Sequence, residues 1–189
     1  MKGLYAIVDY ELFGEKMDEV TQQIIAAGVK IIQFRAKNLT DREFINHALK
    51  LRKLTQGITF IINDRVDIAL AVEADGVHLG QDDMPISLAR PLLKNKIIGL
   101  STHNFEQAIK ATKEKIDYLA IGPIYQTTTK KNAIKPIGPE IIQKIKQITS
   151  IPVVAIGGIN EGNIEGVIKA GADVIAIASG LLNKNSLLR

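Results

Sequence analysis

Polar residues that could bind phosphate or a metal ion follow several aliphatic runs of this chain. They form three groups: residues 33–37, residues 63–64 together with 80–83, and residues 122–130. Each group follows or ends a run that is typical of a buried strand. If these strands belong to one parallel barrel, all three groups open onto the same rim, where such folds place their chemistry. We therefore expect one site that binds a diphosphate and a metal ion.

The first group contains two cations, Arg35 and Lys37, spaced two residues apart. On a strand this spacing places both side chains on the same face. Arginine contacts phosphate oxygens in a bidentate manner, and lysine adds a compact charge. The pair predicts a phosphate contact, and the alternative is a surface turn whose charges are solvated.

Two carboxylates, Asp64 and Asp83, lie near the ends of neighbouring predicted strands. Asp64 could cap a helix that starts at Arg65, and Asp83 could favour the positive end of the helix that follows Pro85. Magnesium typically takes one or two carboxylates together with waters and substrate phosphates. We favour the interpretation that both aspartates hold one Mg²⁺.

Hydroxyl-rich and glycine-rich segments predict further phosphate contacts. Thr127, Thr129 and Lys130 could form a phosphate cradle, or a flexible loop rich in threonine. Gly157 and Gly158, and later residues 178–180, follow two strand-like runs where barrels often bind a phosphate monoester through backbone amides. The two glycines could also serve a tight turn alone.

The histidines show no spacing typical of a metal site. His103 ends a predicted strand beside Ser101, so it could act as a general acid or base at the rim. His78 lies between two aliphatic residues and is interpreted as a packed strand residue.

The elements that must position these residues alternate regularly along the chain. Amphipathic segments, including one opened by a capping box at residues 40–43, separate eight aliphatic runs. The runs lie near residues 4–9, 31–37, 59–64, 76–80, 97–102, 118–125, 152–158 and 174–179. This order predicts a single domain over residues 1–189, folded as a (β/α)8 TIM barrel rather than as an open doubly wound sheet. Residues 180–189 leave room for only a shortened eighth helix, so a homo-oligomer could cover the remaining surface.

Composition excludes several classes of function. The 189 residues carry a net charge of +4, but only 5% are aromatic and no basic tract is interleaved with them, so we expect no nucleic-acid partner. No apolar run reaches membrane-spanning length, and no secretory signal is expected at the start. Cysteine is absent, which excludes thiolate catalysis. A cytoplasmic location is the default expectation.

At these residues the chain resembles the thiamine-phosphate synthase family. The resemblance rests on an ordered set of motifs that runs from the first predicted strand to the eighth. The motifs are residues 5–9, 33–37, 63–67, 74–83, 99–103, 122–130 and 156–159.

The resemblance implies a (β/α)8 barrel that joins hydroxymethylpyrimidine diphosphate to hydroxyethylthiazole phosphate and releases pyrophosphate. By position, Asp64 and Asp83 would hold Mg²⁺, and the pyrimidine would meet Gln33 and Ser101. The diphosphate would meet Arg35, Lys37, Asn63 and Lys130. The thiazole and its phosphate would meet Thr127, Thr129, Gly158, Ala178 and Ser179.

Two features depart from the family pattern, and other functions compete with synthesis. Ala36 occupies a position that is usually acidic in the family, and the C-terminal segment is short. The nearest alternative is a thiazole tautomerase that would use His103 for proton transfer. A non-catalytic protein that binds thiazole phosphate or thiamine phosphate, and a generic phosphate-binding barrel isomerase, are further alternatives.

Overall fold

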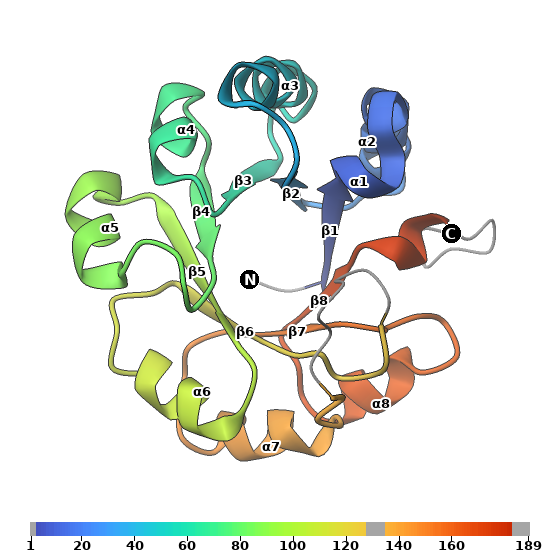
Figure 1. Ribbon diagram of the computed structural model, residues 1–189. Coiled ribbons are helices and arrows are strands. Elements are labelled where there is room, and N and C mark those ends of the chain that lie inside the picture. Colours follow the sequence, from blue (N-terminus) through green and yellow to red (C-terminus); the bar gives the residue numbers. More distant parts are fainter. Residues whose placement is uncertain (1–2, 128–134, 183–189) are drawn as a thin grey trace.

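Eight parallel strands close into a barrel in chain order, with β1 paired to β8 (Figure 1). The computed structural model describes residues 3–127 and 135–182. The strands are β1 (Gly3–Asp9), β2 (Ile31–Arg35), β3 (Thr59–Asn63), β4 (Gly76–Leu79), β5 (Ile97–Thr102), β6 (Tyr118–Ile121), β7 (Val153–Ile156) and β8 (Val174–Ile177). The predicted TIM barrel is confirmed, and the open doubly wound sheet is excluded.

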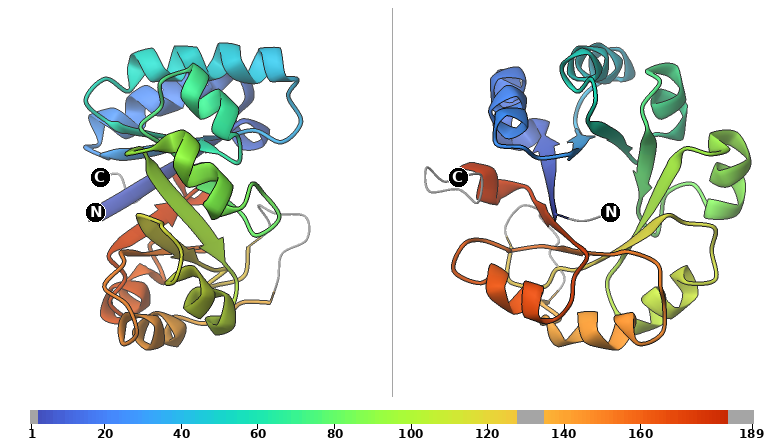
Figure 2. Two further views of the ribbon diagram at one scale, coloured as in Figure 1. Left: turned by 90° about the vertical axis from the view of Figure 1, so that its left-hand side faces the viewer. Right: turned by 180° about the vertical axis from the view of Figure 1, so that it is seen from behind.

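Helices surround the barrel on its outside, as Figure 2 shows from the side and from behind. They are α1 (Tyr10–Phe13), α2 (Met17–Ala26), α3 (Asp41–Leu54), α4 (Val66–Ala71), α5 (Ile86–Leu93), α6 (Phe105–Ala111), α7 (Glu140–Lys146) and α8 (Ile164–Lys169), with 3₁₀ helices η1 (Gly14–Lys16) and η2 (Ser179–Leu182). Up to residue 182, where the described part of the chain ends, the helical segment after β8 is η2, a 3₁₀ helix of four residues. In the parts of the chain that the structure describes, no helix is long and apolar enough to cross a membrane.

The strands are buried on both faces, which explains why their sequences are continuous aliphatic runs rather than alternating ones. Residues that point into the barrel form one cluster that includes Tyr5, Ile61 and Tyr118. Residues that point outwards pack against the helices in two further clusters. This arrangement leaves the loops after the strands as the places where polar groups can gather.

Sequence signals for the helix starts are partly confirmed. Thr40 caps α3 through the predicted capping box with Glu43, and Asn104 caps α6 by accepting from the Gln107 amide. The capping role considered for Asp64 is wrong, whereas the interaction considered for Asp83, with the positive end of the next helix, stays a prediction. Arg65 and Pro85 occupy the N-cap positions of α4 and α5, and neither makes a side-chain capping bond.

Three aspartates repeat one stabilising arrangement at the N-terminal ends of alternate strands. Each directly precedes β4, β6 or β8, accepts a hydrogen bond from an amide at the start of the preceding strand, and forms an ion pair with the helix that comes before that strand. The sets are Asp75 with Phe60 and Arg52, Asp117 with Ile98 and Arg90, and Asp173 with Val153 and Lys146. These contacts hold the barrel at the end opposite to the predicted site.

Replacing Asp173 with asparagine is expected to lower the free energy of unfolding by about 1–3 kcal/mol at neutral pH. Burial opposes ionisation, but hydrogen bonds from Lys146 and the Val153 amide leave the pKa of Asp173 below its ordinary value. A carboxylate whose pKa is lower in the folded than in the unfolded protein stabilises the fold at pH values above its unfolded-state pKa. This stabilisation is lost as the pH falls through the folded-state pKa. The difference from wild type should therefore shrink below about pH 4.

Urea unfolding at a series of pH values measures this effect. Glu161→Gln, at an exposed position, is the control and should leave stability unchanged. If the wild-type protein exceeded Asp173→Asn in free energy of unfolding by the same amount at pH 3 and pH 7, the stabilising role of ionised Asp173 would be contradicted.

Candidate active site

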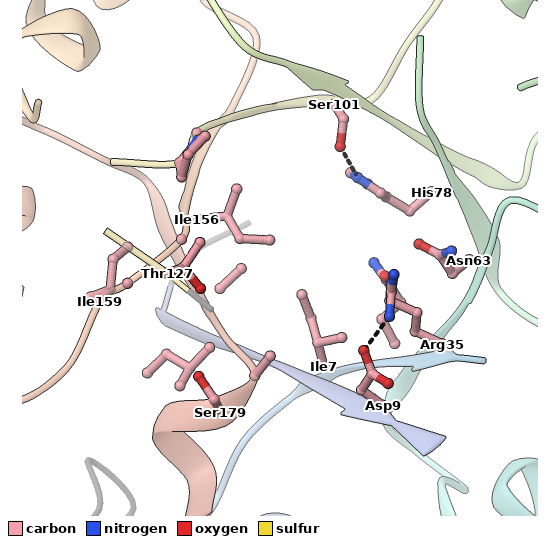
Figure 3. A pocket seen from close by; sticks show the side chains of 18 of the residues that line it. Ile7, Asp9, Arg35, Asn63, His78, Ser101, Thr127, Ile156, Ile159 and Ser179 are labelled. Carbon is pink, nitrogen blue, oxygen red and sulfur yellow. Dashed lines mark hydrogen bonds and ion pairs between the residues drawn. The ribbon is translucent and has the colours of Figure 1, made fainter. Parts of the chain in front are cut away.

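A cavity of about 220 Å³ lies at the C-terminal ends of the strands (Figure 3). It is lined by residues of β1 to β5, β7 and β8 and by residues that follow β2, β5, β6, β7 and β8. The predicted site residues among them are Gln33, Arg35, Lys37, Asn63, Ser101, Thr127, Gly158, Ala178 and Ser179. The expected co-location of the polar groups is therefore observed.

Different polar residues lie on the two sides of the cavity. In Figure 3, Arg35, Asn63 and Ser101 lie on one side, and Thr127 and Ser179 lie on the other. Aliphatic side chains such as those of Ile7 and Ile156 lie between them. Thr129 and Lys130, which were also predicted to contribute, lie outside the described residues.

Arg35 is held by acidic side chains that the sequence analysis did not single out. Its Nη1 forms an ion pair with the buried carboxylate of Asp9, and Glu11 Oε2 lies 3.6 Å from the same nitrogen. Asp9 also accepts a hydrogen bond of 3.0 Å from the Glu11 amide. Burial, followed by the neighbouring carboxyl of Glu11, raises the pKa of Asp9 to about 6, although Arg35 opposes the rise. At neutral pH Asp9 is therefore ionised and orients the guanidinium.

Lys37 reaches the cavity for a different reason from the one predicted. Strand β2 ends at Arg35, so Lys37 does not share a strand face with it. Instead, Glu11 Oε1 accepts hydrogen bonds from the amides of Lys37 (2.7 Å) and Asn38 (3.1 Å), which fixes the segment after the strand. The two cations still line one cavity, but α1 rather than the strand positions the second of them.

The two predicted metal ligands lie side by side at the rim, although neither is among the residues that line the cavity. Asp64 has a φ of 63°, and its carboxylate forms an ion pair with Lys37. Asp83 accepts a hydrogen bond of 2.6 Å from the Gly80 amide. Burial, followed by the carboxyl of Asp64, raises the pKa of Asp83. A carboxyl group whose ionisation is opposed by a neighbouring carboxyl marks a place where a cation would be favoured.

The donor set at this place fits Mg²⁺ rather than a transition metal. Among the described residues, no group of three or more His, Cys, Asp or Glu residues could hold a metal ion by itself. Asp64 and Asp83 offer hard oxygen ligands, and magnesium usually completes such a pair with waters and substrate phosphates. The residues are thus consistent with a metal ion that binds together with a phosphorylated substrate.

The glycines after β7 have a packing role that is independent of any ligand. Gly157 and Gly158 have φ values of 97° and 66°. A Cβ added to Gly158 would lie 2.3 Å from the carbonyl oxygen of Gln126, and one added to Gly157 would lie 2.6 Å from Pro123. These glycines let the loop after β6 approach closely and bring Thr127 to the cavity, so their presence alone does not indicate a phosphate site.

Replacing Gly158 with alanine is expected to destabilise the protein by about 1–3 kcal/mol, because the new methyl group meets backbone that cannot yield cheaply. Gly171→Ala is a matched control, since its φ is 88° but nothing lies within 4 Å of the added Cβ. Denaturant unfolding of both variants separates steric overlap from conformational strain. If both variants lost the same free energy of unfolding, conformational strain alone would account for the effect at Gly158 and the steric overlap would contribute nothing.

His78 is both a packed residue and a cavity residue, so its interpretation from sequence was incomplete. It is 7% exposed, and it lines the cavity while its Nε2 lies 2.8 Å from Ser101 Oγ. Its Nδ1 lies 2.9 Å from the hydroxyl of Tyr118. His103 also lines the cavity, and its Nδ1 lies 2.7 Å from the carbonyl oxygen of Gly122, to which it can only donate. No sequence signal links His78 to Tyr118, because the contact arises only when the barrel closes.

Comparison with known proteins assigns the family. The model of the thiamine monophosphate synthase family matches residues 4–181. The chain belongs to this family. The resemblance inferred from the motifs is thereby confirmed, and magnesium dependence is general in the family.

Curated relatives and solved structures agree with this assignment. The thiamine-phosphate synthase of Chloroflexus aurantiacus is 48% identical over 182 residues, which cover 95% of this chain and 84% of that protein. That of Pelotomaculum thermopropionicum is 45% identical, with 97% and 86% covered. The thiamine phosphate pyrophosphorylase of Pyrococcus furiosus superposes with a TM-score of 0.88 at 40% identity, with 98% and 90% covered. A 3-hexulose-6-phosphate synthase, with a TM-score of 0.67 at 18% identity over 95% of this chain and 91% of that chain, shares only the fold.

Proposed function

We propose that this protein is a thiamine-phosphate synthase, which couples hydroxymethylpyrimidine diphosphate to hydroxyethylthiazole phosphate and releases pyrophosphate. Family membership supports the reaction. The observation that carries the proposal at the level of residues is the rim cluster of Arg35, Lys37, Asp64 and Asp83. It combines cations for a diphosphate with carboxylates for a metal ion beside a cavity that has apolar walls.

The diphosphate is assigned to the ends of β2 and β3. Arg35 and Lys37 would bind its oxygens, together with Asn63 and with Lys130 from the loop after β6. When bound to Asp64 and Asp83, Mg²⁺ would neutralise part of the charge on the departing diphosphate. The side chain of Arg35 is only 15% exposed and the wall between the two polar sides is aliphatic, so the charge of Arg35 would act more strongly here than in water.

The two rings are assigned to the two sides of the cavity. The pyrimidine would contact Gln33 and Ser101. The thiazole and its phosphate would contact Thr127, Thr129, Gly158, Ala178 and Ser179. This placement brings the thiazole nitrogen to the carbon that loses the diphosphate, which converts an encounter of two substrates into a reaction within one complex.

The reaction needs no nucleophile from the protein. The bond between the pyrimidine methylene carbon and the diphosphate oxygen breaks, and its electron pair leaves with the diphosphate. The electron-rich aminopyrimidine stabilises the cation that remains, and the thiazole nitrogen supplies the electron pair of the new C–N bond. The protein's part is to bind the leaving group, orient both rings and exclude water.

The departure at Ala36 has a structural counterpart. Ala36 is 9% exposed and packs in the core between the strands and helices. Asp9 and Glu11 already place two carboxylates beside Arg35. We infer that they supply the negative charge that Ala36 lacks.

Formation of thiamine phosphate by the purified protein tests the proposal. With both substrates and Mg²⁺ present, the product should appear in a molar amount equal to the pyrimidine diphosphate consumed. Absence of product, combined with isomerisation of a thiazole carboxylate phosphate that His103→Ala abolishes, would instead support the tautomerase. Binding of thiazole phosphate without turnover and without dependence on Mg²⁺ would support the non-catalytic alternative.

A further inference from the structure

A chain of hydrogen bonds crosses the inside of the barrel and joins two residues that line the cavity. Gln33 Nε2 donates to the hydroxyl of Tyr5 at 2.6 Å, and this hydroxyl lies 2.9 Å from that of Tyr118. The Tyr118 hydroxyl lies 2.9 Å from His78 Nδ1, and His78 Nε2 lies 2.8 Å from Ser101 Oγ. The chain thus connects Gln33 to Ser101 through three side chains of β1, β6 and β4.

The side chains in the middle of this chain of hydrogen bonds are shielded from water. Tyr5, Tyr118 and Gln33 are each at most 2% exposed. The ring of Tyr118 stacks on His78 and meets Tyr5 edge to face. Gly99 provides the space for this ring, because an added Cβ would lie 2.0 Å from it. A buried polar group without a partner is costly, so these hydrogen bonds constrain one another.

The direction of every hydrogen bond in the chain follows from its first member. An amide nitrogen can only donate, so the hydroxyl oxygen of Tyr5 accepts the hydrogen bond from Gln33. The hydroxyl hydrogen of Tyr5 is then donated to Tyr118, which is the other hydrogen-bond partner of Tyr5 among the described residues. Burial raises the pKa of both tyrosines, so both keep their hydroxyl hydrogens at neutral pH. Tyr118 in turn donates to His78 Nδ1. His78 is then a neutral imidazole that carries its hydrogen on Nε2 and donates it to Ser101.

Turning over the amide of Gln33 would reverse the whole chain. Tyr5 would then donate to the amide oxygen, His78 would carry its hydrogen on Nδ1, and Ser101 would donate to Nε2. The group that Gln33 presents to the cavity therefore determines the group that Ser101 presents. In the observed direction Gln33 offers its carbonyl oxygen as an acceptor, and Ser101 offers its hydroxyl hydrogen as a donor.

We propose that Tyr5, Tyr118 and His78 are positioning residues, which couple Gln33 and Ser101 so that the cavity selects a heterocycle with a hydrogen-bond donor at one end and an acceptor at the other. The choice of heterocycle rests on the proposed function, because an aminopyrimidine has this pattern in its amino group and ring nitrogens. A ring with the opposite pattern would require the chain to reverse.

The tautomer of His78 tests the direction of the chain without any substrate. Nitrogen-15 NMR of the protein labelled at its three histidines should show His78 neutral with its hydrogen on Nε2, the His78→Asn variant providing the assignment. In Tyr118→Phe, which keeps the ring but removes the hydroxyl, this preference should weaken. A hydrogen on Nδ1 of His78 in the wild-type protein would overturn the proposed direction.

Substrate binding tests the coupling. Tyr118→Phe should weaken binding of the pyrimidine diphosphate about tenfold, the effect of losing one to two hydrogen bonds, and should leave binding of inorganic pyrophosphate unchanged. It should also reduce the preference for the amino compound over the analogue with an oxo group in place of the amino group. In a Gln33→Leu background the same change should have almost no further effect. Additive effects of the two substitutions would overturn the coupling.

A control separates positioning from packing. Val154→Ala removes a side chain from the same interior cluster without touching the hydrogen bonds. It should lower stability while leaving the His78 tautomer and the preference for the amino compound unchanged. If the wild-type protein binds the pyrimidine diphosphate no better than pyrophosphate, the proposed function fails, whereas the NMR result still decides the direction of the chain.

Discussion

Asp64→Asn and Asp83→Asn should each lower kcat by about 100-fold or more, because each removes a carboxylate that would hold the metal ion against the leaving group. Binding of thiazole phosphate should change little, since its proposed contacts lie on the other side of the cavity. Steady-state kinetics at saturating thiazole phosphate, together with calorimetric binding of thiazole phosphate, measure the two quantities separately.

Asp82→Asn is the matched control for this prediction. Asp82 neighbours Asp83 in the same loop but is exposed, so its replacement should leave kcat close to that of the wild-type protein. The metal assignment would be wrong if both Asp64→Asn and Asp83→Asn lost affinity for thiazole phosphate yet kept normal turnover at saturation. Raising the Mg²⁺ concentration should partly restore turnover in the variants.

Arg35→Met is expected to lower kcat/KM for the pyrimidine diphosphate by about 100- to 1,000-fold, because the guanidinium would contact charge that develops on the leaving group. The same change should lower the free energy of unfolding by about 3–5 kcal/mol, because it leaves the buried carboxylate of Asp9 without its cation. Adding Asp9→Asn should restore most of the stability and none of the activity.

A second ion pair supplies the control. Arg52 pairs with Asp75 at the opposite end of the barrel, so Arg52→Met should cost stability without changing kcat/KM per folded molecule. If Arg35→Met with Asp9→Asn recovered both stability and turnover, Arg35 would be a structural residue. If Arg52→Met lost as much turnover as Arg35→Met, the loss in both variants would reflect global instability rather than a role of Arg35 at the site.

The fold could be predicted because its signals are local. The aliphatic runs mark strands buried on both faces, and the capping box at Thr40 marks a helix start. The observed strands lie within or close to the predicted runs, with ends that differ by a few residues. The ends of the strands were predicted less accurately than the strands themselves. Lys37 continues the spacing of polar residues at every second position, but the hydrogen-bonded pairing of β2 with β1 ends at Arg35.

The candidate site could be predicted only where the residue type itself indicates chemistry. Arg35 ends a strand, and Asp64 and Asp83 lie in the segments that follow two strands, so their charges stand out beside the aliphatic runs. Tyr5 and Tyr118 resemble ordinary core residues, and their contact joins positions that are 113 residues apart. The role of Asp9 was missed because its effect depends on Arg35 in the neighbouring strand. The single-domain organisation and the contributions of Thr129 and Lys130 stay predictions.

Release of pyrophosphate by the purified protein tests the central claim most directly. The assay contains the pyrimidine diphosphate, thiazole phosphate and Mg²⁺, and each component is omitted in turn. We predict release only when all three are present, in a molar amount equal to the thiamine phosphate formed. A folded protein that binds thiazole phosphate but releases no pyrophosphate from the complete mixture would contradict the assignment as a synthase.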